Sequence, residues 1–390
     1  MAEYTTEAWV IYERGLEVSS GHSDCASLRK EPFSFAALTE GEVLAEPIYG
    51  CWEANMSHAL QRRPVDICNH RGEKKAVLGN AGVVRVLRTD SSVTSVKEGD
   101  VCMIFCNGIA DRYGFPERIL AYDAPGSMGV LSKRMKLKEK QIIPIPLNTR
   151  YSLPQWAAFS LRYVTAWANW KQAYGCWSLN TWGEENPCPS VWAWGGGVSL
   201  AELTLAKFFG CLTVMISAQE THLRTIESNG IKSIDRRQFS NLNFDEEKYR
   251  SDREYKKAYQ ESEDIFLSIV NENTRGSGVS IFVDYIGAPV LRATLKALAR
   301  RGVITTAGWK QGMLISTIRA LECMNWHTHV HTHYARYPEA VEAMQFAELN
   351  GWMPVVSDKI YDWNEIPLLA QDYTEGKVGS YFPIFQINSV

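Results

Sequence analysis

The chain has 390 residues, of which 45% are hydrophobic, 22% charged and 11% aromatic, and its formal net charge is −3. At about 150 residues per domain, this length favours two or three domains with enough apolar residues to bury a core without disulfide staples. The small negative charge supplies no basic surplus to neutralise phosphates, which argues against nucleic acid as a partner.

The nine cysteines are an odd number scattered along the chain, and they do not form the pattern of a disulfide framework. Their usage fits a reducing compartment, so we expect a cytoplasmic protein. The sequence does not begin with a basic segment followed by an apolar one, and it contains no uninterrupted run of about 18 apolar residues. It therefore predicts no secretion signal, no transmembrane helix and no membrane partner.

The first 150 residues indicate a β-rich region, because short β-branched or apolar runs alternate there with Gly, Pro and Asp. We expect strands at residues 8–12, 43–48, 82–87, 101–106 and 141–146. Residues 152–174 then carry apolar side chains at helical spacing. Ser152 precedes a proline in the first turn, as is typical of a helix start.

From residue 190 onward, strand-like and helix-like runs alternate. We expect strands at 191–194, 213–217, 233–235, 281–285 and 302–306, and helices at 200–209, 220–229 and 291–301. Repeated βα units of this length predict an α/β fold with a doubly wound parallel sheet. A charged insertion at residues 236–278 is interpreted as a solvated helix with a loop. The tail from residue 334 returns to mixed patterning and ends in a strand-like run at 378–387.

A glycine-rich turn joins the first of these strands to the helix that follows it. It consists of Gly195, Gly196 and Gly197, with Val198 directly after them. Such a turn lets backbone N–H groups approach a pyrophosphate at a helix N-terminus, where the helix dipole favours negative charge. The third small position of the usual G-x-G-x-x-G pattern is Ser199 here, so a tight turn without a ligand stays open as the alternative.

The second strand of the alternating region ends at Ser217 without an Asp or Glu to accept the 2′-hydroxyl of an adenosine ribose. His222 and Arg224 follow closely, and donors of this kind suit a 2′-phosphate. We therefore predict NADP(H) rather than NAD(H) as the cofactor. The alternative is that His222 and Arg224 are solvated residues of a surface helix.

These features together resemble the medium-chain dehydrogenase/reductase superfamily. Its landmarks are the Leu78-Gly-Asn-Ala-Gly-Val-Val block, the glycine-rich turn and the run that begins at Phe282. Within the superfamily the chain is most similar to crotonyl-CoA carboxylase/reductases and related 2-enoyl-thioester reductases, through residues 121–127, 331–337 and 363–367. The resemblance implies a β-rich GroES-like catalytic domain at residues 1–155 and 334–390. A Rossmann domain is inserted at 156–333, and Thr165, Ile286 and Gly308 complete the predicted cofactor-binding set.

The resemblance points to the zinc-free branch of that superfamily. The four closely spaced cysteines of its zinc-binding alcohol dehydrogenases are missing, and no His-Glu pair follows the Leu78 block. Residues 327–333 place four histidines at alternate positions, which would share one face of a strand. A metal site there is one interpretation. We favour an edge strand whose last histidine, His333, reaches toward the nicotinamide, and we predict no metal.

The loop at residues 50–58 matches the family loop that faces the nicotinamide, and with His333 it supplies the predicted catalytic residues. Glu53 is a general acid if burial raises its pKa, whereas a solvent-facing Glu is the alternative. Trp52 is interpreted as a pocket wall, and Asn55 as an orienting amide. Carboxylating members hold carbon dioxide with a loop Asn and a His. His333 matches that His, but Trp52 stands at or near the Asn, so the resemblance does not carry carboxylation to this chain.

The sequence therefore predicts an NADPH-dependent reductase of a 2-enoyl thioester that is bound to coenzyme A or to a carrier protein. Two alternatives remain open, namely a zinc-free ketone or quinone reductase and a nucleotide-binding subunit that has lost its chemistry. The family also implies a homodimer with the strand at residues 327–330 beside the two-fold axis. An exposed edge strand would otherwise invite aggregation.

Overall fold

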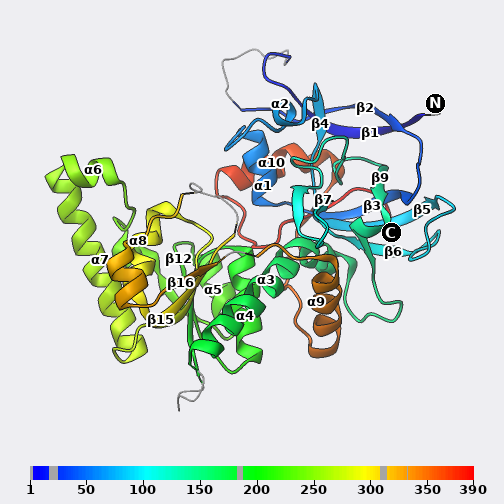
Figure 1. Cartoon of the computed structure of the whole chain (residues 1–390). Coiled ribbons are helices and arrows are strands. Elements are labelled where there is room, and N and C mark those ends of the chain that lie inside the picture. The colour runs from blue at the N-terminus through cyan, green and yellow to red at the C-terminus, as the bar shows by residue number, and fades with distance from the viewer. Residues whose placement is uncertain (1–2, 17–24, 182–187, 308–313, 332) are drawn as a thin grey trace. The chain divides into compact units, whose positions relative to one another are not determined.

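Figure 1 shows a computed structural model of the chain, which describes residues 3–16, 25–181, 188–307, 314–331 and 333–390. The chain divides into two compact units, one formed by Met1–Val164 with Ala335–Val390 and the other by Thr165–Tyr334. We call them the β-rich unit and the α/β unit. The long helix α3 (Leu153–Asn180) begins in the first and ends in the second. The predicted helix start is confirmed, and the helix extends beyond the predicted end at residue 174.

The β-rich unit contains a three-stranded sheet in the order β2-β1-β4 and a seven-stranded sheet in which β10-β6-β5-β3-β18-β17 are neighbours and β9 pairs with β3. Three of the five strands predicted for this region lie within β1, β3 and β5, whereas β6 and β10 are shorter than the predicted 101–106 and 141–146. The strands are β1 (Glu3–Tyr12), β2 (Arg29–Ala36), β3 (Glu42–Cys51), β4 (Lys75–Val77), β5 (Gly82–Thr89), β6 (Val101–Ile104), β7 (Asn107–Ala110), β8 (Pro116–Ile119), β9 (Met135–Lys138), β10 (Ile142–Pro144), β17 (Ile360–Tyr361) and β18 (Ile384–Gln386). The helices are α1 (Ala54–Leu60), α2 (Ile67–Arg71), α9 (Tyr337–Asn350) and α10 (Ile366–Thr374).

Strand β3 sits between β5 and β18 and leads into the loop that the sequence singled out. Gly50, near the end of β3, faces the ring of Phe385 so closely that a Cβ there would lie 2.3 Å from its Cζ. A larger residue would force the two strands apart, so glycine permits this close approach. The pairing fixes the chain direction at Cys51, immediately before the loop.

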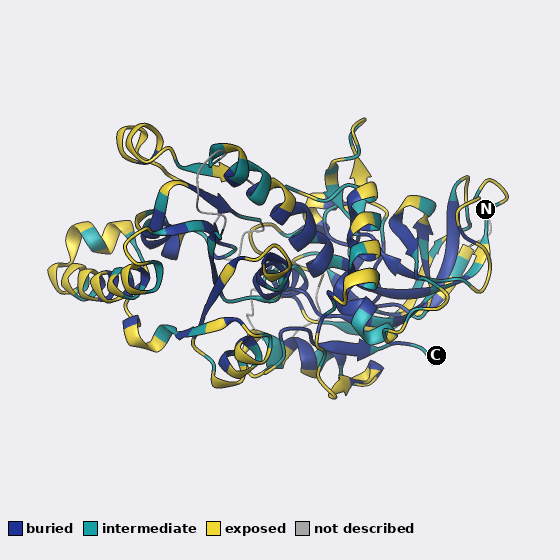
Figure 2. Cartoon of the chain, turned by 90° about the horizontal axis from the view of Figure 1, so that it is seen from below, coloured by how far each residue is buried: buried dark blue, intermediate teal, exposed yellow. Residues whose placement is uncertain are grey.

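The α/β unit is built on a six-stranded parallel sheet in the order β13-β12-β11-β14-β15-β16. This is the 3-2-1-4-5-6 order of a doubly wound fold, so the predicted fold class is confirmed. Figure 2 shows buried residues along the strands and exposed residues on the outer faces of helices. The elements are β11 (Ser190–Trp194), α4 (Gly197–Phe208), β12 (Leu212–Ser217), α5 (Glu220–Ser228), β13 (Lys232–Asp235), α6 (Glu246–Ser251), α7 (Arg253–Thr274), β14 (Val279–Val283), α8 (Ala288–Ala297), β15 (Leu298–Thr305) and β16 (His329–His331).

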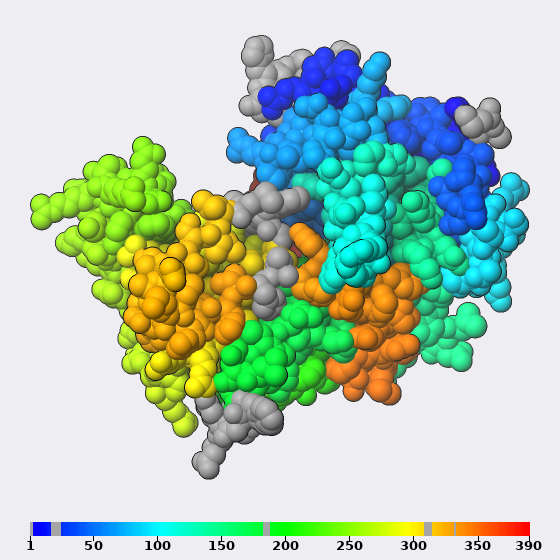
Figure 3. Space-filling view, in the orientation of Figure 1, coloured from blue at the N-terminus to red at the C-terminus, as the bar shows by residue number. Residues whose placement is uncertain are grey.

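The prediction of a solvated helix with a loop for the charged insertion is wrong in part. The insertion contains two helices, α6 and α7, and the segment 245–275 forms a yellow-green lobe at the outer edge of the α/β unit (Figure 3). Helix α7 buries Tyr259, Phe266 and Val270 in the core cluster that also holds Trp192 and Trp194. These apolar residues recur at helical spacing among charged ones, so α7 covers one face of the sheet.

The predicted helix at residues 291–301 is also corrected. Helix α8 begins at Ala288, after Gly287, and ends at Ala297. Leu298 is extended and pairs with Val279 of β14, so β15 begins where the helix was expected to continue. The pairing with a neighbouring strand outweighs the helical spacing of the local sequence.

All nine cysteines are free thiols. In the part of the chain that the structure describes, no helix is long and apolar enough to cross a membrane. Within the same residues, no group of three or more His, Cys, Asp or Glu side chains is placed to hold a metal ion.

Candidate functional site

The glycine-rich turn lies at the carboxyl end of β11 and opens helix α4. Gly196 is the N-cap residue with a φ of 153°, a conformation that favours glycine, and no side chain caps the helix. A Cβ on Gly195 would lie 3.0 Å from the carbonyl oxygen of Ile216 in β12. The turn therefore leaves the first backbone N–H groups of α4 uncapped by side chains, as an anion at a helix N-terminus requires. Gly197 and Val198 are the first residues of α4, so the glycine-rich turn joins a strand to a helix as predicted.

The residues predicted to hold a 2′-phosphate follow β12. Ser217 is its last residue, and the Ser217 Cβ lies 3.8 Å from where a Cβ on Gly195 would be. His222 and Arg224 lie on α5, directly after that strand. The Arg224 side chain is 77% exposed, and its Nε lies 3.6 Å from Oε1 of Glu220. His222 and Arg224 thus lie on a surface helix, as the alternative stated, and this helix directly follows the end of β12.

Sequence reasoning missed a second guanidinium at this edge. Arg237 follows β13, the neighbour of β12, and pairs with Asp235 at 2.6 Å and with Glu220 at 3.4 Å. The carboxyl ends of adjacent parallel strands lie at one edge of the sheet, which is the signal that identifies Arg237. Its carboxylate partners hold the Arg237 side chain, which is 57% exposed, in place.

In the β-rich unit, the loop after β3 buries the predicted catalytic residues Trp52 and Glu53 and leaves Asn55 half-buried. Trp52 is fully buried, and its Nε1 donates to Oγ of Ser57 at 3.0 Å. Its ring meets that of Phe385 edge-on, with centroids 6.4 Å apart. Asn55 is half-buried, and its Nδ2 donates to Oδ1 of Asn80 at 3.1 Å. The amide of Asn55 is therefore oriented by the Leu78 block.

Glu53 is the N-cap residue of α1 and only 4% exposed, so the alternative of a solvent-facing Glu is wrong. Nη1 of Arg162, from α3, lies 3.0 Å from its Oε1. The same guanidinium is 2.7 Å from Sγ of Cys51, and its Nη2 donates to the carbonyl oxygen of Trp52 at 2.8 Å. Burial raises the pKa of Glu53 to about 7, although the Arg162 cation opposes the rise. A carboxyl group with that pKa exchanges a proton near neutral pH.

Arg162 and Tyr373 belong to this cluster and were not predicted. Arg162 lies inside the apolar helix α3, and its guanidinium stands over the ring of Phe382, 5.6 Å from the centroid. Tyr373 of α10 interacts electrostatically with Arg162, and burial raises its pKa. The signal in the sequence was a charged residue in the mainly apolar first part of a helix, where Arg162 is the one charged residue between Leu153 and Trp170. A buried charge needs a partner, and the partner here is Glu53.

His333 is held by its backbone in the α/β unit. Nδ2 of Asn169 donates to the His333 carbonyl at 3.1 Å, and Oδ1 of Asn169 accepts from the His333 amide at 3.2 Å. Asn169 also donates to the carbonyl of Thr165 at 3.1 Å and accepts from Thr305 at 3.3 Å. Ile286 is buried and follows β14. Thr165 and His333 therefore share one anchor, whereas Gly308 lies outside the described residues.

The histidine run does not form one strand. Strand β16 spans only His329–His331, while His327 precedes it with a φ of 54°. The prediction that four histidines line one strand face is wrong, because the chain turns at His327. His329 Nε2 lies 3.1 Å from Nδ2 of Asn180. The sequence predicts that His333 forms one site with Trp52, Glu53 and Asn55. These residues belong to different units, so this stays a prediction.

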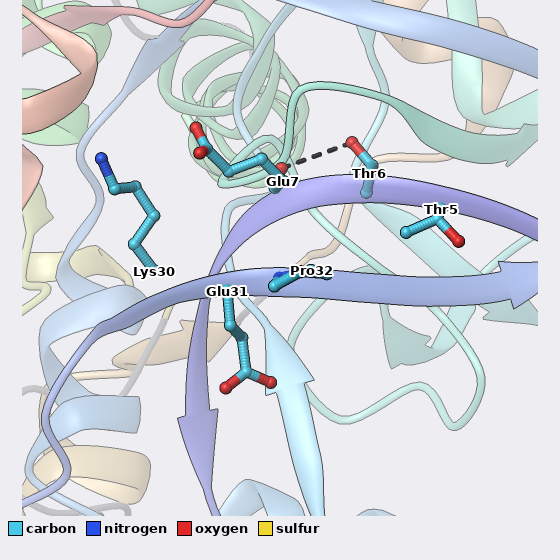
Figure 4. Close-up of a pocket in the computed structure, with 6 residues that line it drawn as sticks. All are labelled: Thr5, Thr6, Glu7, Lys30, Glu31 and Pro32. Carbon is cyan, nitrogen blue, oxygen red and sulfur yellow. Dashed lines mark hydrogen bonds between the residues drawn. The ribbon is translucent and has the colours of Figure 1, made fainter.

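A separate pocket of about 340 Å³ lies on β1 and β2, lined by Thr5, Thr6, Glu7, Lys30, Glu31 and Pro32 (Figure 4). Its charged side chains have partners nearby, since Glu31 pairs with Lys75 at 2.6 Å and Lys30 donates to Asn364 at 2.8 Å. None of the predicted site residues lines it. It is therefore not a candidate for the chemistry.

A doubly wound 3-2-1-4-5-6 sheet, inserted between two segments of a β-rich unit, is the fold that the resemblance implied. The solved structure of crotonyl-CoA carboxylase/reductase AntE in complex with NADP is similar over 99% of this chain and 95% of that chain, with a TM-score of 0.79 and 18% identity. The 2-octenoyl-CoA carboxylase reductase CinF, solved with NADP and 2-octenoyl-CoA, is similar over 98% of this chain and 87% of that chain, with a TM-score of 0.78 and 15% identity.

A thermostable alcohol dehydrogenase from Pyrobaculum aerophilum is similar over 98% of this chain and 100% of that chain, with a TM-score of 0.71 and 14% identity. No family model matches the sequence. No curated protein matches it either. The similarity to solved structures thus establishes the fold, and the functional assignment has to come from the residues of the site.

Proposed function

We propose that this chain binds NADP(H) and reduces the conjugated double bond of a 2-enoyl thioester. The observation that carries the reaction is that the carboxyl group of Glu53 is buried in the loop after β3, and this burial raises its pKa to about 7. Reduction of such a double bond leaves an enolate that must take up a proton. The similarity to reductases solved with NADP and with an enoyl-CoA supports the substrate class.

The residues present fit the cofactor. The turn requires glycine, because a Cβ on Gly195 would lie 3.0 Å from the carbonyl oxygen of Ile216 and Gly196 has a φ of 153°. The backbone N–H groups after Gly196 suit the pyrophosphate. Ser217, His222 and Arg224, joined by Arg237, would hold a 2′-phosphate at the end of β12. Thr165, Ile286 and Gly308 would complete the predicted set. When bound, NADPH supplies the hydride.

The chain's own groups would do the remaining chemistry. Glu53 would hold the proton that the enolate takes up, and Arg162 would fix the position of that carboxyl group. Asn55 and backbone N–H groups would polarise the thioester carbonyl. His333, anchored through Asn169, would orient the reacting groups. We expect no requirement for a metal ion. Stoichiometric zinc in the purified protein, with activity lost on chelation, would contradict this expectation.

The test is NADPH oxidation with crotonyl-CoA, a quinone and a simple aldehyde, each with and without bicarbonate. We expect turnover with crotonyl-CoA that does not depend on bicarbonate. Turnover with the quinone or the aldehyde alone would identify a ketone or quinone reductase. Binding of NADPH without turnover of any substrate would identify a nucleotide-binding subunit without chemistry.

Cofactor preference has its own test, a pair of titrations followed by nicotinamide fluorescence. We expect tighter binding of NADPH than of NADH, and Arg224→Ala should weaken the binding of NADPH more than that of NADH. Equal affinities of the unchanged protein for the two cofactors would remove the assignment of a 2′-phosphate site.

We also propose a homodimer, in the cytoplasm, where the nine free thiols would stay reduced. Apolar side chains are exposed beside β16, among them Ile318, Leu321, Met324, Trp326 and Val330. Strand β16 pairs only with β15 among the described strands, so its other edge is open to a second copy. Light scattering should show a dimer at micromolar concentration and a monomer for Leu321→Asp. A stable monomer of the unchanged chain would rule the dimer out.

A further inference from the structure

A carboxyl group that the proposed reaction does not use is buried inside the α/β unit. Glu202 lies in the second turn of α4, and its side chain is fully buried. The hydroxyl group of Tyr285 donates a hydrogen bond to Oε2 of Glu202, whereas Oε1 has no hydrogen-bond partner among the described residues. We call these two residues the Glu202–Tyr285 pair. A buried carboxylate with so few donors is costly to ionise, and burial raises the pKa of Glu202 to about 8.

Among the residues that the structure describes, no cation compensates the Glu202 carboxyl group. Helix α4 packs on β11 and β12, and neither strand carries a titratable side chain. The other carboxylate nearby, Asp284, is occupied, because it accepts from the amides of Ile286 and Gly287, each at 3.0 Å, and from Oγ1 of Thr294 at 2.9 Å. The positive charge of Arg236 lowers the pKa of Asp284, although burial raises it overall. A positive charge that arrives near the pair would therefore be felt by Glu202.

The pair is linked to the edge of the sheet where parallel α/β folds bind their ligands. Tyr285 follows the end of β14, and its hydroxyl group also interacts with Thr305, the last residue of β15. Thr305 in turn donates to Asn169, which holds the backbone of His333. Ligands of this fold lie outside the carboxyl ends of the strands.

The position of Tyr285 and Thr305 along this edge of the sheet identifies which half of a bound dinucleotide would lie closest to them. The pyrophosphate belongs at the N-terminus of α4, and the 2′-phosphate at the end of β12. In the strand order β12-β11-β14-β15, the remaining half extends over β14 and β15. Tyr285 and Thr305 therefore lie on the nicotinamide side.

We propose that the Glu202–Tyr285 pair is a proton site that responds to the oxidation state of the bound dinucleotide. It keeps its proton beside the neutral ring of NADPH and releases it when NADP⁺, with its positively charged ring, binds. The inference rests on the proposed binding of NADP(H). Only the O–H bond of the Glu202 carboxyl group breaks, the proton goes to solvent, and no electron is transferred. The physical reason is that a nearby cation favours the ionised form of a carboxyl group.

The test measures protons rather than turnover. Isothermal titration calorimetry at pH 7.5, in buffers with different ionisation enthalpies, gives the number of protons released as NADP⁺ or NADPH binds. Both cofactors carry the 2′-phosphate, so protons that it exchanges are the same for both. The difference in proton release between NADP⁺ and NADPH is therefore due to the charge of the nicotinamide ring. If the cation lowers the pKa of Glu202 from about 8 by one unit, NADP⁺ releases about half a proton more than NADPH.

The variants isolate the pair. Glu202→Gln should abolish the difference between NADP⁺ and NADPH. The matched control Glu261→Gln, on α7 with a side chain that is 64% exposed, should preserve it. Tyr285→Phe keeps the carboxyl group and removes its donor, which raises the pKa of Glu202 further. The extra release should then shrink at pH 7.5 and return by pH 8.5, and this variant decides the question if Glu202→Gln does not fold.

Each outcome decides between the two proposals. Equal proton release with both cofactors, a difference that survives in Glu202→Gln, or an unchanged pH profile in Tyr285→Phe would overturn the proton site and leave the binding of NADP(H) intact. Failure of the unchanged protein to bind either cofactor would overturn both proposals.

Discussion

Replacing Glu53 by glutamine tests whether burial controls this carboxyl group. In the folded chain its pKa is raised from the ordinary value of 4.5 to about 7. The stability that the neutral carboxyl group contributes is fully present below pH 4.5 and is lost as the pH rises through about 7. The difference between the pKa of 4.5 in the unfolded chain and that of about 7 in the folded chain corresponds to about 3 kcal/mol of unfolding free energy. Glu53→Gln cannot ionise, so its stability relative to the unchanged protein should rise by that amount between pH 4.5 and pH 7.5.

Urea unfolding followed by tryptophan fluorescence at several values between pH 4.5 and pH 8 measures this rise. Loss of the Arg162 contact shifts the whole curve of the variant but does not change its slope with pH. The exposed control Glu261→Gln should follow the unchanged protein at every pH. Parallel curves for Glu53→Gln and the unchanged protein would refute the argument that burial raises the pKa of Glu53.

Two further predictions concern the proposed cofactor and reaction sites. Gly196→Val should weaken the binding of NADPH and NADH alike, by at least about tenfold, because a side chain at φ 153° strains the turn that the pyrophosphate approaches; fluorescence titrations that show unchanged affinities would contradict it. Glu53→Gln and His333→Ala should each lower turnover by about tenfold or more and leave the affinity for NADPH nearly unchanged, as expected when one acid-base or orienting group is lost; full activity in both variants, measured by steady-state kinetics, would place the chemistry elsewhere.

The fold could be predicted from the sequence wherever local pattern and burial agree. The strands of the parallel sheet are short apolar runs such as the one ending at Trp194, and Ser152 with the following proline marks the start of α3. Local pattern failed where a neighbouring element decides the structure. Leu298 extends because it pairs with Val279, and Phe266 is buried because a sheet lies beneath its helix.

The site was predictable only in its local parts. Glu53 could be singled out because it is a titratable residue in a loop with a family counterpart, but its partner Arg162 comes from a helix much later in the chain. Pairings between distant segments leave no local pattern, and the same holds for Glu202 and Tyr285. In both cases the sequence does show a charged residue within an apolar helix, which indicates a buried group with a partner.

Arg162→Met provides the sharpest test of that partnership. The variant removes the guanidinium from Glu53, Cys51 and the Trp52 carbonyl, so the pKa of Glu53 should rise further above 7. At pH 5 Glu53 is neutral in both proteins, and the variant loses only the hydrogen bonds of the guanidinium, about 1–3 kcal/mol. At pH 8.5 the unchanged protein has an ion pair, whereas the variant has a buried carboxyl group without a cation, so the loss should grow to about 3–5 kcal/mol. Urea unfolding at the two pH values measures this growth, and adding Glu53→Gln to Arg162→Met should abolish it, since no carboxyl group is left to ionise. A loss of equal size at both pH values would show that Arg162 does not control the ionisation of Glu53.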